Sequence, residues 1–461
     1  MPRLLYLPVG RVAFDLAAAR TLVAATRALL QELGITPIAP DELLTTTEAL
    51  ADFVQRPAAA GADLVLFQNT TFVGGDFIAT VAAHHTGPVV VWALREPGLG
   101  GRLRLNSLTG ANSACHTLRT LGRRGDFWLG NPGEPRIRRR LAAIWRALGV
   151  ARRLATGLKI GVVGEPPPGF AFCGADPVAL RAATGVELCR LDLRTLFRTA
   201  PDVPEAAWRT TLTQAAAQVK DLALEAPTTV KFAQAATRLL QFCREENLGA
   251  LAIRCWPEWV QEFGAAACSS LSFLTEIGLP AACESDVHGA LSMFIARELA
   301  DGAPPYLGDL VHVDEAANSV VFWHCGAGAF SLAHPATGAR AGVHPNNRTG
   351  LTLEFGLKPG PVTLCRLSCV AGRYRLLILA GEAMDSPQRF QGTTVEVRLP
   401  APAAALVEDL FQEGFEPHYA LVHGDRVEEL AALARLLALD HMVYAAASSG
   451  VGGSKRRYPS D

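Results

Sequence analysis

Gly278-Leu-Pro-Ala-Ala-Cys-Glu-Ser-Asp-Val-His-Gly289 is a short apolar run that breaks off into acidic residues. The apolar part, Leu279 to Cys283, is too short for a helix and stops at Glu284, as a buried parallel strand does when it delivers side chains to its carboxyl edge. Open α/β sheets place their ligand sites at that edge. We therefore expect Glu284, Asp286 and His288 to gather at a functional edge of a parallel sheet.

The residues after Gly289 predict one helix and then a second strand. Apolar residues recur at helical spacing as far as Asp301-Gly302, where a glycine and two following prolines mark the helix end. We expect the second strand to open with Asp309, so that Glu284 and Asp309 are held on neighbouring strands. One carboxylate at a strand end is most often a cap or turn residue, but a pair suits a hard divalent cation or a proton shuttle.

The composition is that of a large soluble protein without a charge excess. The 461 residues are 49% hydrophobic and 19% charged with a formal net charge of −1, which fits two or three domains and gives no reason to expect nucleic-acid binding. No apolar run is long enough to span a bilayer, and the start is too short for a secretory signal. The ten cysteines show no Cys-x-x-Cys spacing, so we interpret them as reduced core residues of a cytoplasmic protein rather than as a disulfide or zinc framework.

The order of predicted elements divides the chain into three domains and a tail. Residues 1–155 alternate short strands and helices and residues 156–305 repeat that pattern, which predicts two successive Rossmann-like, doubly wound α/β domains, the second carrying Glu284. Residues 306–447 turn to β-rich runs separated by glycine and proline, which predicts an antiparallel, barrel-like domain carrying Asp309. The tail, 448–461, is expected to be disordered.

Polar residues at predicted strand ends supply further candidates for a binding site. In the first domain Gln68 and Asn69 directly follow a strand and Asn106–Asn112 leads into a helix; each segment could simply cap a helix, but both lie where such folds bind small polar molecules. In the second domain a strand ends in Arg254-Cys-Trp-Pro-Glu258, which adds Arg254 and Trp256. The segment Gly164-Glu-Pro-Pro-Pro-Gly169 is not a phosphate loop, because its prolines lack the amide donors that such a loop needs.

Three separated segments resemble the L-fucose isomerases, within the wider L-fucose/L-arabinose isomerase group, and they occur in the family's order. They are Glu284-Ser-Asp-Val-His-Gly289 with Gly308-Asp309, Lys358–Leu367 with Leu377–Glu382, and Pro417-His418 with His423-Gly424. There are departures from the family pattern. The interval from Glu284 to Asp309 is one residue longer, Ser285 replaces an asparagine, and Pro417 replaces the asparagine before the histidine.

The resemblance implies a metal-dependent isomerase. Glu284, Asp309 and His418 would hold a divalent cation, usually Mn²⁺, and Glu284 and Asp309 would also move the proton, with His423 among the substrate-binding residues and no nucleotide cofactor. The family's members are trimer-based hexamers in which an N-terminal domain of an adjacent chain contributes to each site. The expected partners are therefore a sugar and further copies of this chain, with residues 1–155 as a lid and oligomer contact, and neither nucleic acid nor membrane.

The expected reaction is the interconversion of an open-chain aldose and its ketose. One proton moves between C2 and C1 while a metal-bound enediolate forms, because an electrophile must hold the developing negative charge. An L-fucose isomerase-like activity is the main hypothesis. A first alternative is an isomerase of the same fold acting on the sulfonated hexose sulfoquinovose, with Arg254, Arg348 and His344 as the candidates for a cationic pocket. A second alternative is a sugar-binding protein without catalytic activity.

Overall fold

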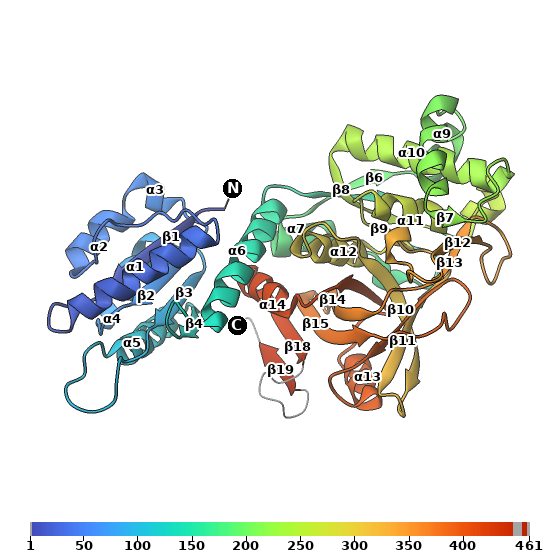
Figure 1. Ribbon diagram of the computed structural model, residues 1–461. Helices are drawn as coiled ribbons and strands as arrows, with labels where there is room; N and C mark the ends of the chain where they lie inside the picture. The colour runs from blue at the N-terminus through green and yellow to red at the C-terminus, as the bar shows by residue number, and fades with distance from the viewer. Residues whose placement is uncertain (1, 446–453, 459–461) are drawn as a thin grey trace. The chain divides into compact units, whose positions relative to one another are not determined.

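The computed structural model describes residues 2–445 and 454–458, and the chain divides into two compact units, Met1–Arg152 and Arg153–Asp461 (Figure 1). The first unit is built on a parallel sheet in the order β1-β2-β3-β4, with strands β1 (Leu4–Val9), β2 (Leu64–Asn69), β3 (Val89–Ala93) and β4 (Asp126–Leu129). Its helices are α1 (Leu16–Glu32), α2 (Thr47–Val54), α3 (Pro57–Ala60), α4 (Gly75–His84), α5 (Ser107–Thr120) and α6 (Pro135–Ala155).

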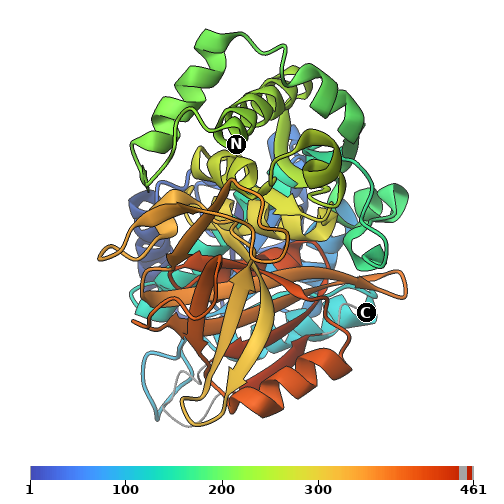
Figure 2. The same cartoon turned by 90° about the vertical axis from the view of Figure 1, so that its right-hand side faces the viewer.

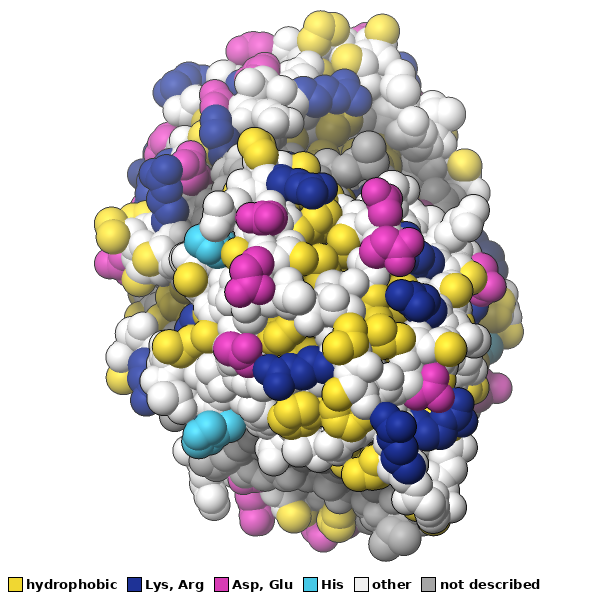
Figure 3. All heavy atoms as spheres, turned by 90° about the vertical axis from the view of Figure 1, so that its left-hand side faces the viewer, with side chains coloured by type: hydrophobic (Ala, Val, Ile, Leu, Met, Phe, Trp, Pro, Cys, Tyr) yellow, Lys and Arg dark blue, Asp and Glu magenta, His cyan; other side chains and the backbone are white. Residues whose placement is uncertain are grey.

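Local sequence accounts for these elements. Every residue of β1, β2 and β3 is buried, as expected for strands covered on both faces. Helix α1 begins after Asp15, whose carboxylate accepts the backbone N–H of Ala18 and so satisfies a free donor of the first turn. Figure 3 shows hydrophobic side chains exposed between charged ones on one face of the molecule, and the first unit exposes Val12, Leu99, Leu103 and Leu108. The expected contact with further copies of the chain stays a prediction.

The second unit contains another parallel sheet, in the order β6-β5-β8-β9. Its strands are β5 (Lys159–Val163), β6 (Glu187–Leu191), β8 (Leu248–Ile253) and β9 (Ala281–Cys283). Strands β6 and β8 flank β5 on opposite sides, so the direction of winding reverses at β5. The helical elements of this part are η1 (Ala171–Cys173), α7 (Pro177–Thr184), α8 (Leu193–Thr199), α9 (Glu205–Ala216), α10 (Pro227–Glu246), η2 (Trp259–Phe263), α11 (Cys268–Glu276) and α12 (Val287–Leu299).

An antiparallel barrel completes the second unit. Strands β15-β14-β17-β10-β11-β16 pair in that order, and the pairing of β16 with β15 closes the ring. The barrel strands are β10 (Tyr306–Asp314), β11 (Ser319–His324), β14 (Gly360–Val370), β15 (Arg373–Ala383), β16 (Thr393–Arg398) and β17 (His418–His423). The remaining elements are β7 (Val219–Lys220), η3 (Phe330–Leu332), β12 (Ala339–Gly342), β13 (Thr352–Gly356), α13 (Ala403–Gln412), α14 (Val427–Leu436), β18 (Asp440–Ala445) and β19 (Ser454–Tyr458). In Figure 2 the orange and red barrel strands lie below the green helices α9 and α10.

The mixed architecture of parallel α/β sheets followed by a C-terminal antiparallel barrel agrees with the prediction. One strand was placed wrongly. Strand β10 opens at Tyr306, not at Asp309, because the apolar residues Tyr306 and Leu307 are already buried in the sheet. It also pairs with β11 and β17, not with β9, so Glu284 and Asp309 do not belong to neighbouring strands of one sheet.

The expected disordered tail lies mostly outside the described residues, at 448–453 and 459–461. Between those segments Ser454–Tyr458 forms strand β19, antiparallel to β18, where we had expected disorder. Within the described residues no helix is long and apolar enough to cross a membrane. All ten cysteines are free thiols, as the spacing predicted.

Candidate active site

The turn after β9 directs Glu284 away from the sheet. Glu284 and Ser285 both adopt left-handed backbone conformations, with φ of 57° and 56°, which non-glycine residues rarely adopt and which cost of order 1 to 3 kcal/mol each. The surrounding structure holds them there, because Ser285 Oγ donates to the Gly164 carbonyl at 2.8 Å and its N–H donates to the Ile253 carbonyl at 3.1 Å. Such strain is typical of functional positions.

Glu284, Asp309 and His418 come together although they lie far apart in the sequence. His418 is the first residue of β17 and stands directly opposite Asp309 of β10 in the antiparallel register. Its Nε2 atom lies 3.2 Å from Glu284 Oε2 and 3.4 Å from Asp309 Oδ1. The His418 side chain is 1% exposed, Glu284 14% and Asp309 29%, so the two carboxylates border the accessible side of the cluster.

The donor atoms of this cluster fit a divalent cation. His418 Nε2 is buried and has no hydrogen-bond partner among the described residues, even though two carboxylate oxygens are near it. Neighbouring ligand atoms about 2.1 Å from an octahedral ion stand about 3.0 Å apart, and the two separations from His418 Nε2, 3.2 Å to Glu284 and 3.4 Å to Asp309, are close to that value. Cys173 also places a donor atom within 4.8 Å of those of Glu284 and His418. Two carboxylate oxygens and one imidazole also leave coordination positions for a substrate.

Three buried charged residues, Asp286, Arg366 and Glu416, hold the Nδ1 side of His418 in position. Asp286 Oδ2 accepts a hydrogen bond from His418 Nδ1 at 2.8 Å and an ion pair from Arg366 Nη1 at 2.5 Å, and Arg366 Nε reaches Glu416 at 3.4 Å. A hydrogen bond at Nδ1 sets the imidazole tautomer that leaves the Nε2 lone pair free, as in most metal-binding histidines. The arrangement therefore orients His418 toward the two carboxylates.

The charges of these residues stabilise one another. Burial opposes ionisation of Asp286, but Arg366 and His418 overcome it and hold the pKa of Asp286 well below its usual range. Burial also opposes the charge on Arg366, yet Asp286 and Glu416 raise the pKa of Arg366 above its ordinary value. For Glu284, burial is again outweighed, here by His418 and by the Trp256 N–H, so the pKa of Glu284 lies below its ordinary value.

Aromatic side chains form one wall of the site. Trp256 Nε1 donates to Glu284 Oε1 at 3.0 Å, so the predicted candidate Trp256 positions a carboxylate of the cluster. The Phe172 ring lies 6.0 Å from the His418 ring, and Phe170 packs edge-on against Trp256 at 5.4 Å. We did not single out these two phenylalanines from the sequence. The available signal was their position just after the loop at Gly164–Gly169, at the carboxyl edge of β5.

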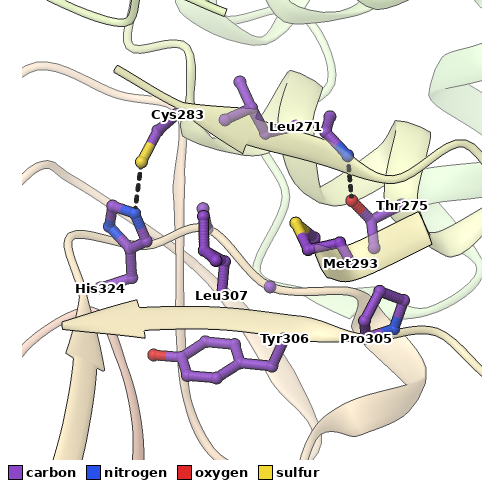
Figure 4. A pocket seen from close by; sticks show the side chains of 11 residues that line it. Leu271, Thr275, Cys283, Met293, Pro305, Tyr306, Leu307 and His324 are labelled. Carbon is purple, nitrogen blue, oxygen red and sulfur yellow. Dashed lines mark hydrogen bonds between the residues drawn. The ribbon is translucent and has the colours of Figure 1, made fainter. Parts of the chain in front are cut away.

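A second group of potential metal ligands, a thiol and an imidazole, lies next to the cluster of Glu284, Asp309 and His418. Cys283 Sγ and His324 Nε2 are 2.5 Å apart, and the His324 ring lies 6.0 Å from the His418 ring. Figure 4 shows Cys283 and His324 facing each other beside a small pocket whose other walls are mainly apolar. The pocket has a volume of about 10 Å³, about what a single water molecule needs, so it cannot hold a sugar.

Two predicted binding residues serve other purposes in the structure. Gln68 is fully buried and both ends of its amide are used, since Nε2 donates to Thr26 and Oε1 accepts from Tyr6. Gln68 does not follow a strand as expected but lies inside β2, and its side chain points into the core of the first unit. His423 is five residues beyond His418 on β17, about 17 Å away at the rise of a strand, and its Nε2 bonds the Lys358 carbonyl.

The other predicted binding residues differ in whether their polar groups already have partners. Arg254 already has partners, because its guanidinium makes two hydrogen bonds of 2.7 and 2.6 Å to Glu258 and also binds two backbone carbonyls. Arg348 is exposed and makes no ion pair among the described residues, and His344 is partly buried. The assignment of a cationic pocket to Arg254, Arg348 and His344 stays a prediction. Asn69 is fully buried with both amide atoms unpaired within the described part of the chain, so its role as a binding residue stays a prediction.

Comparison with known proteins gives one consistent result. Residues 339–444 match the family model described as L-fucose isomerase, C-terminal domain. A protein named sulfoquinovose isomerase from Alkalicoccus urumqiensis is 48% identical over 439 residues, which cover 95% of this chain and 98% of that protein. Proteins of the same name from Priestia megaterium and Clostridium sp. are 46% and 38% identical, each over 95% of this chain and 98% of their own. Among solved structures, D-threo-3-hydroxyaspartate dehydratase from Delftia sp. HT23 aligns at 10% identity with a TM-score of 0.13, which carries no argument.

Proposed function

The chain belongs to the L-fucose isomerase-like family and is an isomerase, and from that premise we propose that it converts sulfoquinovose to the corresponding ketose at a divalent metal held by Glu284, Asp309 and His418. The alternative of a sugar-binding protein without activity is thereby set aside. The general reaction, aldose–ketose isomerisation, is that of the family. The sugar and the metal are the parts that we propose.

We propose sulfoquinovose rather than L-fucose as the substrate because similar proteins bear the name sulfoquinovose isomerase. Three relatives named sulfoquinovose isomerase share 38 to 48% identity with this chain over 95% of its length. A sulfonate carries a fixed negative charge, so its binding requires a cation or several N–H donors. Arg254 is neutralised by Glu258, and we therefore propose Arg348 as the cation of this chain that meets the sulfonate.

The observation that carries the metal assignment is the unpaired, buried Nε2 of His418 facing two carboxylate oxygens. A divalent cation, for which Mn²⁺ is our proposal, would act as a Lewis acid toward the oxygens of the substrate when bound. Asp286 holds the His418 ring in the tautomer that can bind a cation. The ion pair with Arg366 keeps that carboxylate ionised and in place despite its burial.

Glu284 and Asp309 are the residues that we propose to move the proton between C2 and C1. Glu284 Oε2 faces the proposed metal position. We propose that Oε1, which accepts one hydrogen bond from the Trp256 N–H and keeps a second lone pair, accepts and returns the proton. Asp309 is the most exposed member of the cluster, at 29% of its side chain, so it is accessible to substrate. The rings of Phe170, Phe172 and Trp256 reduce the water around these groups, which strengthens their electrostatic interactions.

Ketose formation tests the proposed function. The purified protein, supplemented with Mn²⁺, would be incubated with sulfoquinovose, L-fucose, D-arabinose and L-arabinose in parallel. Selective conversion of sulfoquinovose supports the proposal. Efficient conversion of L-fucose with none of sulfoquinovose would restore the original hypothesis. The homo-oligomer and the cytoplasmic location stay predictions.

A further inference from the structure

Three metal-binding side chains gather outside the candidate active site. They are Cys268 at the start of α11, Cys325 directly after β11, and His344 in the connection between β12 and β13. One donor atom from each lies within 4.8 Å of the other two, and the two thiol sulfurs are 3.7 Å apart. None of the three takes part in the cluster of Glu284, Asp309 and His418.

The separation of the sulfurs matches a tetrahedral thiolate site. Two thiolates bound to one Zn²⁺ at about 2.3 Å stand about 3.8 Å apart at the tetrahedral angle, compared with 3.7 Å between Cys268 Sγ and Cys325 Sγ. A disulfide would instead require a separation of about 2.05 Å. Contact between two thiols alone could produce the same distance, but it would not explain an imidazole from a third segment at the same point. We propose that Cys268, Cys325 and His344 form a Zn²⁺ site, with water as the fourth ligand.

The surroundings suit a soft or borderline cation better than Mn²⁺. The set consists of two sulfurs and one nitrogen without a carboxylate, whereas Mn²⁺ prefers oxygen ligands. Cys268 is buried, and Cys325 and His344 are partly buried, so the site is sheltered yet reachable. The neighbouring Cys268 thiol and burial raise the pKa of Cys325 to about 12, so this thiol is protonated without a cation and metal binding must release its proton.

His344 needs one local rearrangement. Its Nδ1 atom accepts the backbone N–H of Asn346 at 3.2 Å and that of Asn347 at 3.5 Å, both at or beyond the long end of the range for such bonds. Ligation through either ring nitrogen replaces these contacts, because the ring must then present a lone pair to the metal. The loss is small beside the gain from binding a divalent cation to two thiolates.

The proposed zinc site would fix the position of His324, which lies next to His418 of the candidate active site. Cys325 N–H donates to His324 Nδ1 at 2.9 Å, and the His324 ring lies 6.0 Å from the His418 ring. A metal bound to Cys325 would therefore fix the position of His324 by joining three separate segments of the chain. This role is structural and does not depend on which sugar the enzyme converts.

Cobalt substitution tests the proposal, because Co²⁺ bound to thiolate shows a near-ultraviolet charge-transfer absorption that Co²⁺ bound only to oxygen and nitrogen lacks. The full-length, metal-free protein would be titrated with Co²⁺ alone. We expect the absorption to appear, to saturate at the intensity of one thiolate-bound ion per chain, to be lost in Cys325→Ser and Cys268→Ser, and to be displaced by Zn²⁺. It should persist in His418→Ala, which alters only the catalytic cluster.

Two control variants separate this site from thiols next to the active site. Cys283 and Cys173 lie near His418 in other groups of potential ligands, so Cys283→Ser and Cys173→Ser should keep the absorption. If it disappears in either of them but survives in Cys325→Ser, the cation is bound elsewhere and the proposal is wrong. Absence of any thiolate absorption in the folded wild-type protein would also overturn it, as would mass-spectrometric detection of a Cys268–Cys325 disulfide in the protein as isolated.

Discussion

Asp286 and His418 are joined by a hydrogen bond of 2.8 Å between Asp286 Oδ2 and His418 Nδ1, and both side chains are almost completely excluded from solvent, at 0% and 1% exposure. Because the bond occupies Nδ1, the Nε2 atom is the one that faces Glu284 and Asp309. Arg366 neutralises the buried carboxylate on its other side. The candidate metal site thus depends on a residue that is not one of its proposed ligands.

Asp286→Asn should weaken metal binding without removing a proposed ligand. Asparagine keeps the oxygen that caps α12 through Gly289 N–H, but it removes the charge that fixes the His418 tautomer. Loss of such a supporting group typically lowers metal affinity about 10- to 100-fold, which isothermal titration with Mn²⁺ would measure. Excess Mn²⁺ should restore much of the activity. If affinity is unchanged while the protein stays folded, Asp286 does not position His418.

Glu284→Gln should abolish exchange of the C2 proton of the sugar with solvent deuterium. The amide keeps the shape and an oxygen donor, but it lacks the basicity that proton abstraction needs. Proton NMR of the sugar in D₂O would follow the exchange separately from ketose formation. Exchange at the wild-type rate would mean that another group is the base.

His418→Ala should lower manganese content and activity together, because it removes one of three proposed ligands. His423→Ala is a matched control, since it changes a histidine at the opposite end of the same strand. We expect the control to retain its metal, as measured by elemental analysis after gel filtration. Equal metal loss in both variants would indicate a general effect on the barrel rather than loss of a ligand.

Arg348→Met should raise the KM for sulfoquinovose at least tenfold if this side chain meets the sulfonate, since a charge-assisted hydrogen bond contributes about 1.5 to 3 kcal/mol. Arg254→Met should instead lower the thermal stability, because it leaves Glu258 without its partner. Kinetics with sulfonated and unsulfonated hexoses distinguish the two roles. A selective loss of sulfoquinovose activity in Arg254→Met alone would reverse our assignment.

His85 should make the first unit less stable in acid. Burial, together with Arg123, lowers the pKa of His85 below its unfolded value of about 6.5. Its stabilising contribution is therefore complete above that value and is lost as the pH falls toward the lower folded pKa. His85→Gln should reduce the drop in melting temperature between pH 7.5 and 5.5, compared with a change at the exposed His84. An unchanged drop would exclude His85 as its source.

The sequence made some of this site predictable for identifiable reasons. The apolar run that stops at Glu284 marked a strand end, and the turn there does project the carboxylate from a sheet edge. The pairing of Asp309 with His418 could not be read from spacing, because antiparallel partners 109 residues apart are chosen by the closure of the barrel. The direction of a side chain could not be read from the sequence either. For this reason Gln68 was expected in a binding site, although its side chain points into a core.

Residues that act on other site residues were the hardest to foresee. Arg366 lies in the middle of a β-rich run, where a charged residue usually faces solvent, yet it is completely buried against Asp286 and Glu416. Phe172 touches His418 only because the loop after β5 folds back over the same edge as β9. Both contacts arise from long-range packing, which local patterns do not encode.

Turnover of sulfoquinovose by the metal-stripped protein, measured as Mn²⁺ is added back, tests the central claim most directly. We expect no ketose without metal and a rate that rises in proportion to bound Mn²⁺ until one ion per chain occupies the cluster of Glu284, Asp309 and His418. Full activity in the metal-free protein, or no conversion of sulfoquinovose by the fully loaded protein, would contradict the account.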